Sequence, residues 1–535
     1  MLRLIALVAA TAALNGLAAD KPAFATHAST AAGNAHDAAL AGVFDAREKD
    51  WRNGAIVYQV LVDRFAPSAN LAAKRSLYPA PKVVREWSEM PRRGTYLERE
   101  KLWSHEIEFW GGDLASLRTR LDHIQSLGVD VLYLNPIHLA YTNHKYDAFD
   151  YQAVSPEFGT RADVKALAAD LHRRGLKLVL DGVFNHMGRN APVFAEAMAN
   201  PASPKRDWFY FGPQYQSGAR IWWLAENLPE LNLENPAVRA HVYGARDSVV
   251  KSYLREGVDG WRLDVAVDIG FQWLEELTRA AHAEKPGSLV VGEIANYPKE
   301  WFPAVDGVMH FTLREILLRM ANGQLDAAHA QRMVDRMMAE APMEHLLKSW
   351  LMLDNHDTPR LATSVPVDAA RRLAQVLQFT LPGAPNLYYG SEIGMAGGDD
   401  PEMRAPMRWD RVHDGNVDLQ WTRKLVALRK AHRALRIGNY RPVTAQRLFC
   451  FERHTDRARD TAIVLANPSD REVRETVMPA NSKLMNTWNL VDALTGTKVR
   501  ITNGLLDVTL PPHGVLVLAP ELSPGGGYSA YKRVQ

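Results

Sequence analysis

In four short segments of the sequence, an apolar run is followed by carboxylate side chains, and in two of them also by a histidine. They read DGVFNH from Asp181, GVDGWRLD ending at Asp264, GEI around Glu293, and LDNHD ending at Asp357. Each follows a β-branched or leucine-rich run, which predicts a buried strand with a polar group at its carboxyl end. Because the carboxyl ends of parallel strands meet at one face of a barrel, we expect these groups to form a single site.

Asp264 and Glu293 have the chemistry that hydrolysis of a glycosidic bond requires. A retaining mechanism needs two carboxyl groups about 5 Å apart, one a nucleophile and one an acid that later acts as a base. Arg262 lies two residues before Asp264 and therefore on the same strand face, so we expect it to lower the pKa of Asp264 and keep it an anion. Glu293 follows the apolar run 289–292, and burial there should raise its pKa. We therefore predict that Asp264 is the nucleophile and Glu293 the acid.

Three neighbouring residues offer contacts to a sugar. Asp357 supplies a third carboxylate, and His356 and His186 supply ring nitrogens that can hold hydroxyl groups next to the reacting bond. Each residue alone has a plain alternative, since a strand-end Asp often caps a helix and a buried His is often only a core residue. The four segments together, in this order, favour the site.

The elements that must position these residues alternate between strands and helices. Helix-like segments at 113–127, 161–174 and 236–256 separate apolar runs. This pattern predicts an α/β fold, a (β/α)8 TIM barrel, within a catalytic domain at 51–438. The eight expected strands are 54–65, 129–137, 176–183, 258–265, 289–294, 307–311, 350–353 and 386–390.

The stretch 187–235 after the third expected strand is too long for an ordinary loop, which has about 2 to 6 residues. We predict a small inserted domain there. Its aromatic side chains suit stacking on sugar rings, and the alternative is that they form the core of the insert. They are Trp208, Phe209, Tyr210, Phe211, Tyr215, Trp222 and Trp223.

Short alternating runs such as TAIVLAN and GVLVLAP predict a C-terminal all-β sandwich at 439–522, followed by a Gly-rich tail at 523–535. At the other end, one early positive charge and the apolar stretch Leu4 to Leu14 predict a signal peptide at 1–25, cleaved after Ala19 or Ala25. A membrane anchor is the alternative, but the stretch is shorter than the roughly 20 residues a spanning helix needs. We expect a loosely ordered leader at 26–50 and an exported protein, periplasmic or secreted, with no membrane association after cleavage.

The composition limits the classes of molecule that the protein is expected to bind. The 63 basic and 61 acidic residues nearly cancel, and no basic run is interleaved with aromatics, so a nucleic-acid partner is not expected. A neutral substrate suits this balance better than a polyanion. Cys450 is the only cysteine, so no internal disulfide can form and stability must come from packing.

The four motifs, in their order and spacing, resemble those of the α-amylase family of glycoside hydrolases, and the resemblance runs from Gly54 to about Gly438. It implies that Asp264 is the nucleophile, Glu293 the general acid/base and Asp357 the transition-state stabiliser. It also implies a set of substrate-binding residues, with Tyr146 of HKYDAFDY forming a platform under the reacting sugar. That set is Arg262, His186, His356, Tyr146, Asp181 and His144.

HKYDAFDY, LPELNLENP and YYGSEIGMAGGDDPEMRAPMRW resemble the branch that contains neopullulanases, cyclomaltodextrinases and maltogenic amylases. Those enzymes usually carry an N-terminal β domain used in dimerisation, and the barrel here begins near Gly54, so we expect a monomer. The family's calcium loop after DRF is usually rich in Asn and Asp, whereas this chain reads APSAN, although Asp113 of GGDL is present. The resemblance therefore leaves the metal unknown, with calcium the candidate, and implies no organic cofactor.

The function expected from these observations is retaining hydrolysis of α-1,4 bonds in an α-glucan such as starch, maltodextrin or cyclodextrin. The alternatives are a transglycosylase or a cyclomaltodextrinase-neopullulanase activity, because water and a sugar hydroxyl compete for the same intermediate. A different class, a non-catalytic glucan-binding protein, is expected to lack one or more of the three carboxylates. This chain retains Asp264, Glu293 and Asp357.

Overall fold

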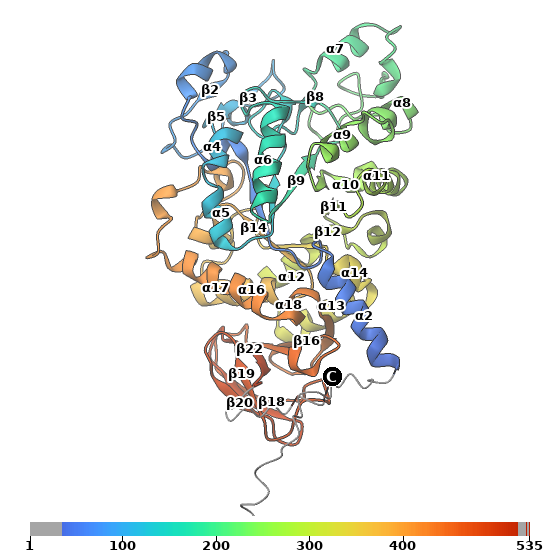
Figure 1. Ribbon diagram of the computed structural model, residues 1–535. Coiled ribbons are helices and arrows are strands. Elements are labelled where there is room, and N and C mark those ends of the chain that lie inside the picture. Colours follow the sequence, from blue (N-terminus) through green and yellow to red (C-terminus); the bar gives the residue numbers. More distant parts are fainter. Residues whose placement is uncertain (1–34, 523–530, 532–533, 535) are drawn as a thin grey trace, which may run out of the picture.

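The computed structural model describes residues 35–522 together with Tyr531 and Val534. Its centre is a closed barrel of eight parallel strands, each at a position predicted from the sequence (Figure 1). The expected α/β barrel is confirmed. In chain order the barrel strands are β1 (Val57–Val60), β6 (Val131–Leu134), β9 (Lys177–Gly182), β10 (Gly260–Leu263), β11 (Leu289–Ile294), β12 (Gly307–His310), β13 (Trp350–Met352) and β14 (Ala384–Tyr388).

Alternation along the strands fills the barrel with layers of side chains. Val57, Val131, Val179, Val291 and Trp350 belong to one buried apolar cluster inside the barrel. Two residues further along several of these strands, the inward positions become polar. The register sets Arg262 beside Asp181, so the charged layer lies directly above the apolar one, at the carboxyl end of the strands.

Helices surround the barrel (Figure 1). Two expected helices are each divided: Thr119 Oγ1 donates to the Ser116 carbonyl at 2.6 Å where the first divides, and a π-helical turn at Ala240–Gly244 interrupts the second. The longer helices are α5 (Leu121–Leu127), α6 (Arg161–Arg173), α9 (Val249–Arg255), α11 (Phe271–Glu284), α12 (Phe311–Ala321), α13 (Ala327–Glu340), α16 (Asp368–Thr380) and α17 (Val417–Ala431). The shorter ones are α3 (Val62–Phe65), α4 (Leu114–Arg118), α8 (Pro236–Arg239), α10 (Ala266–Ile269), α14 (Met343–Leu346), α15 (Leu361–Ser364) and α18 (Arg433–Ile437).

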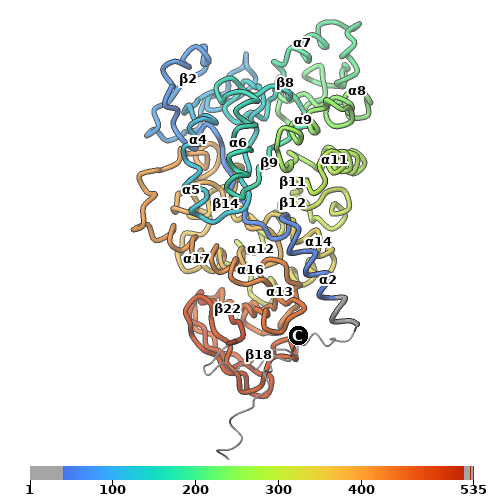
Figure 2. Tube along the Cα trace, in the orientation of Figure 1, coloured from blue at the N-terminus to red at the C-terminus, as the bar shows by residue number. Residues whose placement is uncertain are grey.

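Two insertions lie together at one end of the barrel, and Figure 2 shows them at the top of the molecule. The insert at 187–235 contains α7 (Pro192–Ala199) and two successive hairpins, the first closed by the bridge Phe211 to Ala219 and the second by the bridge Ile221 to Pro229. The sequence analysis did not predict the second, at 66–113, which has its own small apolar core around Phe109. Its strands are β2 (Val83–Val84), β3 (Tyr96–Leu97), β4 (Leu102–Trp103) and β5 (Glu108–Phe109), and the nearby hairpin β7 (His138–Ala140) and β8 (Ala148–Val154) follows β6.

The C-terminal region is all-β, as predicted, and lies at the opposite end of the barrel from the insertions (Figure 1). A six-stranded sheet and a two-stranded sheet enclose one apolar core, which includes the buried free thiol of Cys450. The strands are β15 (Asn439–Pro442), β16 (Phe449–His454), β17 (Ala462–Ala466), β18 (Val473–Val477), β19 (Asn489–Asp492), β20 (Lys498–Arg500), β21 (Leu506–Leu510) and β22 (Val515–Pro520).

The segment expected to be a loose leader contains the helix α2 (Ala35–Lys49), so that expectation is wrong for its second part. The helix is ordered by contacts that the local sequence does not reveal: Phe44 is buried, and Arg47 pairs with Glu344 of α14 at 2.7 Å. The predicted signal peptide at 1–25 and almost all of the tail at 523–535 lie outside the described residues. Within the described residues, no helix has the length and apolarity that crossing a membrane requires.

Candidate active site

One buried guanidinium connects three carboxylates at the carboxyl end of the barrel. Arg262 Nη1 lies 2.9 Å from Asp181 Oδ1 and 3.0 Å from Asp264 Oδ1, and Nη2 lies 2.9 Å from Glu293 Oε2. These residues come from β9, β10 and β11 or the positions directly after them. The structure therefore brings both predicted reacting carboxyls to the same cation.

The pKa values in this cluster differ from the sequence expectation in one respect. Burial raises the pKa of Glu293, as predicted, but it also raises the pKa of Asp264 well above its ordinary value. Arg262 acts in the lowering direction on both groups, but burial, with the neighbouring carboxylates, outweighs it. The prediction of a lowered pKa for Asp264 is therefore wrong. Since one cation faces several buried carboxyls, their mutual repulsion adds to burial in favouring the protonated forms.

The backbone after Asp264 is arranged toward Glu293. The Val265 amide donates to Glu293 Oε2 at 2.9 Å. Val265 has φ of 38°, a left-handed conformation that is rare for a β-branched residue and costs about 1–3 kcal/mol. This strained turn fixes the Val265 amide against Glu293 Oε2. Glu293 Oε1 does not take part in that hydrogen bond.

A second wall of the site is built from Tyr146, His356 and Asp357. The Tyr146 and His356 rings stack with centroids 5.4 Å apart and an interplanar angle of 8°. Tyr146 donates its hydroxyl proton to Asp181 at 2.9 Å, and His356 Nε2 lies 3.0 Å from Asp357 Oδ2. These contacts join the predicted platform tyrosine to the predicted third carboxylate through one imidazole.

The protonation of His356 follows from its partners. The Gln59 amide donates to Nδ1 at 2.9 Å, so Nδ1 is the acceptor and Nε2 carries the proton toward Asp357 and Tyr146. Burial, and then the positive charge of Arg262, hold the pKa of His356 well below its usual range. His356 is therefore a neutral donor in this site.

Several contributors to the site were missed from the sequence. Arg404 contacts Asp357 Oδ1 at 3.2 Å and donates to the His356 carbonyl at 2.8 Å, while Tyr133 donates to Asp181. Strand alternation contained part of the signal, because Gln59 and Tyr133 are paired in register and lie two residues beyond the apolar layer. The local sequence pattern does not predict that Arg404 contacts Asp357, which is 47 residues away in the sequence.

His186 faces the predicted nucleophile. Its Nε2 lies 3.8 Å from Asp264 Oδ2, is buried, and has no hydrogen-bond partner. Burial lowers the pKa of His186 to about 3, so it is neutral and its Nε2 remains available to a substrate hydroxyl. His144 differs: Nε2 lies 3.1 Å from Glu106, and Nδ1 accepts from the Tyr146 amide, so both nitrogens hold the loop that carries Tyr146.

The aromatic side chains of the insert divide between the two roles considered for them. Trp208 and Phe209 are buried, so they belong to the core of the insert. Trp222 stacks on His186 with centroids 5.6 Å apart. Trp223 is 78% exposed.

The residues expected at the family's calcium position do not form an oxygen cage. Lys74 Nζ lies 2.5 Å from Asp113 Oδ2, and Asp113 Oδ1 accepts from the Ser116 amide at the start of α4. An ammonium therefore occupies the side of Asp113 that a cation would use, whereas calcium takes six to eight oxygen ligands. Within the described residues, no group of three or more His, Cys, Asp or Glu side chains is arranged to hold a metal.

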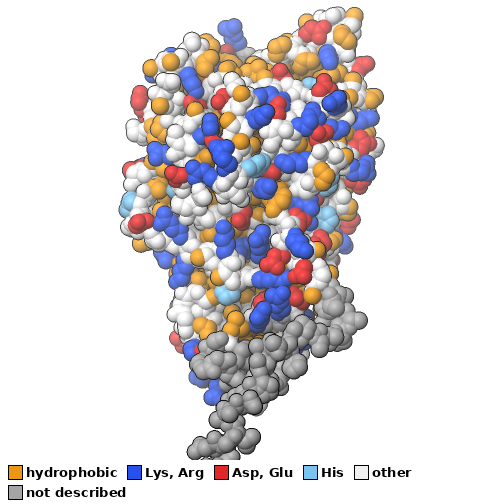
Figure 3. Space-filling model, viewed as in Figure 1, with side chains coloured by type: hydrophobic (Ala, Val, Ile, Leu, Met, Phe, Trp, Pro, Cys, Tyr) orange, Lys and Arg blue, Asp and Glu red, His pale blue; other side chains and the backbone are white. Residues whose placement is uncertain are grey.

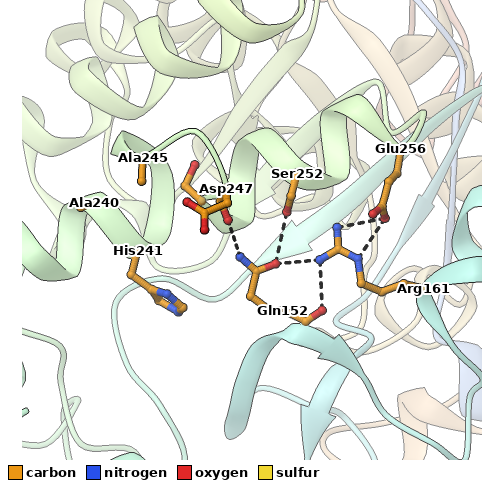
Figure 4. A pocket seen from close by; sticks show the side chains of 9 residues that line it. Gln152, Arg161, Ala240, His241, Ala245, Asp247, Ser252 and Glu256 are labelled. Atoms are coloured by element: carbon orange, nitrogen blue, oxygen red, sulfur yellow. Dashed lines mark hydrogen bonds and ion pairs between the residues drawn. The ribbon is translucent and has the colours of Figure 1, made fainter.

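One other hollow of the surface is lined by polar groups that contact one another. These groups belong to Gln152, Arg161, Ser252 and Glu256: Arg161 donates to Gln152 at 2.7 Å and pairs with Glu256 at 2.9 Å (Figure 4). These contacts join β8 to α6 and α9. On the face seen in Figure 3, basic and acidic side chains are mixed.

In this closed parallel barrel, the third, fourth and fifth strands lead into carboxylates around Arg262, and the segment after the seventh strand adds Asp357, which is held by Arg404. This arrangement is typical of a sugar-processing hydrolase. The chain belongs to the α-amylase family of glycoside hydrolases, since the alpha amylase catalytic domain matches residues 59–420. The resemblance inferred from the motifs is confirmed.

Among relatives, neopullulanase 2 of Thermoactinomyces vulgaris is 32% identical over 486 residues, covering 88% of this chain and 78% of that protein. A cyclomaltodextrinase of Geobacillus thermopakistaniensis is 33% identical over 490 residues, with coverage of 88% and 78%. Among solved structures, the cyclic alpha-maltosyl-(1→6)-maltose hydrolase from Arthrobacter globiformis, in complex with that sugar, has a TM-score of 0.74 at 30% identity and covers 88% of this chain and 99% of its own.

Proposed function

We propose that this protein is a retaining α-glucan hydrolase that cleaves α-1,4-glucosidic bonds by double displacement. The observation that carries the proposal is the joint contact of Asp264 and Glu293 with the two terminal nitrogens of Arg262. Two carboxyls on one guanidinium lie close together, which suits a retaining pair at about 5 Å better than an inverting pair, which needs room for a water between them.

In the first step, Asp264 attacks the anomeric carbon while Glu293 gives its proton to the leaving oxygen. The carbon–oxygen bond to the leaving sugar breaks as the bond to Asp264 forms. In the second step, Glu293 takes a proton from water, the water oxygen attacks the same carbon, and Asp264 leaves as an anion. Burial raises the pKa of Glu293, which favours the acid form that the first step requires.

The neighbouring groups suit the positive charge that develops on the sugar. Asp357 supplies negative charge and is held by Arg404. His186 is a neutral donor for a hydroxyl group, His356 holds Asp357 and Tyr146 beside the sugar, and the Tyr146 ring is the platform. Asp181 fixes Arg262 and Tyr146, so its role is to position them.

The substrate class follows from the relatives, which bear the names neopullulanase and cyclomaltodextrinase. We propose starch, maltodextrin or cyclodextrin as substrates, with transfer to sugar acceptors as a competing outcome at high sugar concentration. Parallel digestion of soluble starch, pullulan and β-cyclodextrin, with product analysis at low and high sugar concentration, tests this. Absence of products from all three would contradict the proposal and favour the glucan-binding alternative.

The remaining proposals concern the state of the whole protein: it is exported, monomeric and independent of calcium and of organic cofactors. The N-terminal charge and apolar run support export, and the Lys74 contact with Asp113 supports calcium independence. Cell fractionation with sequencing of the mature N-terminus tests export, and an intact Met1 in the cytoplasm would contradict it. Light scattering at micromolar concentration tests the monomer, which a dimer mass would exclude.

A further inference from the structure

The second hairpin of the insert, closed by the bridge Ile221 to Pro229, is hydrogen-bonded directly to the segment after β9 that carries His186. The Met187 amide donates to the Pro229 carbonyl at 3.0 Å, and the Leu231 amide donates to the Asn185 carbonyl at 2.9 Å. The tip of the hairpin is closed by the Trp222 amide, which donates to the Leu228 carbonyl at 2.9 Å. The position of the tip is therefore fixed relative to the site.

Trp222 attaches this tip to the residues around the site. Its ring stacks on His186, and its Nε1 donates to Asp268 Oδ2 at 2.9 Å. Asp268 lies on α10, the short helix that begins directly after Asp264 and Val265. The tip thus spans from the end of β9 to the segment after the predicted nucleophile, and lies beside the place where the sugar reacts.

Trp223 turns the other way. It is 78% exposed and Leu224 is 77% exposed, which makes them the two most exposed large hydrophobic side chains among the described residues. Trp223 also has φ of 47°, a left-handed conformation that a bulky residue adopts only under constraint. A solvent-exposed indole lowers solubility, and a strained backbone lowers the stability of the fold. Backbone strain of this kind is concentrated at functional sites.

We propose that Trp223, with Leu224, forms a glucan-binding platform that holds a glucose unit of the chain beyond the reacting sugar. We choose a glucan as the ligand because the platform is continuous with the site. The Trp223 ring centroid lies 6.4 Å from that of Trp222, and Trp222 stacks on His186. His186 in turn faces Asp264. A chain leaving the reacting position reaches this edge, and the apolar face of a glucose ring stacks on an indole. This inference rests on the proposed α-glucan activity and assigns it a specificity residue.

The kinetic test compares Trp223→Ala with the parent on maltoheptaose and on 4-nitrophenyl α-maltoside, which is too short to use both the site and the platform. We expect KM for maltoheptaose to rise about three- to tenfold, with kcat retained, so that the long-to-short ratio of kcat/KM falls. Trp223→Phe should recover most of that ratio. Val417→Ala, an exposed apolar residue on α17, is the matched control and should keep the parent ratio.

A binding measurement separates the two proposals. Calorimetry with maltoheptaose in the Asp264→Asn background should show weaker binding when Trp223→Ala is added. If the Asp264→Asn protein binds maltoheptaose and the added change has no effect, the platform is excluded while the proposed function stands. If the Asp264→Asn protein binds none and the parent cleaves none, the proposed function fails and the platform loses its ligand. A parent dimer that Trp223→Ala converts to a monomer would identify the surface as a subunit interface and overturn the platform.

Discussion

At the scale of single residues, Arg262 is the group on which the charge balance of the site depends. It is fully buried and faces Asp181, Asp264 and Glu293, and these contacts act against the burial that raises the pKa of both reacting carboxyls. A buried charge of this kind is costly to remove, because the partners are left without compensation.

Arg262→Lys tests this role. Lysine cannot reach both Asp264 and Glu293 with a planar fork, so we expect kcat to fall by about 100-fold. The pKa of Asp264 should rise when the guanidinium is lost, so the acidic limb of the pH–activity profile, where the nucleophile becomes protonated, should move to higher pH. A profile of kcat/KM against pH measures this, and an unmoved acidic limb would contradict the role given to Arg262.

Glu293 has a separate test, because its role is to supply a proton. Glu293→Gln keeps the shape of the side chain but cannot protonate a leaving group, so turnover of maltodextrin should be almost abolished. An activated glycosyl fluoride needs little protonation and should still react. Equal loss on both substrates would show that Glu293 does not act as the general acid.

At the scale of elements, the insertion at 66–113 contains the ion pair between Lys74 and Asp113, at the position where the family resemblance made calcium the candidate. Burial alone would raise the pKa of Asp113, but hydrogen bonds from Lys74, Ser68 and Ser116 lower it. Because the folded pKa lies below its ordinary value of 3.8, the stabilisation is complete above that pH and is lost as pH falls through the lowered pKa.

A chelator should therefore change the melting temperature of the parent protein little, whereas Lys74→Met should cost about 1.5–3 kcal/mol of unfolding free energy at neutral pH. The difference between variant and parent should shrink in strong acid. Lys165→Met, at an exposed position of α6, is the control. A large loss of stability in chelator, restored by calcium, would show that Asp113 still binds a metal.

The helix α2 is a second element with a measurable role. Phe44 is 1% exposed and the adjacent Val43 is 44% exposed, which provides a matched pair. Phe44→Ala should lower the free energy of unfolding by about 3–5 kcal/mol, and Val43→Ala should change it by less than about 0.5 kcal/mol. Denaturant titration measures both, and equal effects would mean that α2 does not pack as described.

These elements show how far the sequence could be interpreted. The eight barrel strands were predicted because each contains a short apolar run, and helix-like segments separate several of these runs. The helix α2 was not, because its order depends on distant partners such as Glu344. The raised pKa of Asp264 was missed for the same reason: alternation predicted the contact with Arg262, but no local pattern gives the extent of burial.

At the scale of the whole molecule, two insertions from different barrel loops are placed at the end that carries the site (Figure 2). The insert after β9 contributes Trp222 to the surroundings of His186, and the hairpin after β6 contributes Tyr146. The β sandwich lies at the other end, where Arg453 of β16 donates to the carbonyls of Thr380 and Gly438. The site and the β sandwich therefore lie at opposite ends of the barrel.

The central claim is that Asp264 forms a covalent bond to the sugar during catalysis. Incubating the parent protein with a fluorinated glucosyl fluoride, which slows release of the intermediate, and mapping the product by peptide mass spectrometry tests this claim directly. The account predicts one sugar on the peptide that contains Asp264, and no adduct with Asp264→Asn. An adduct on another carboxylate, or turnover of natural glucan with inverted anomeric configuration and no adduct, would contradict it.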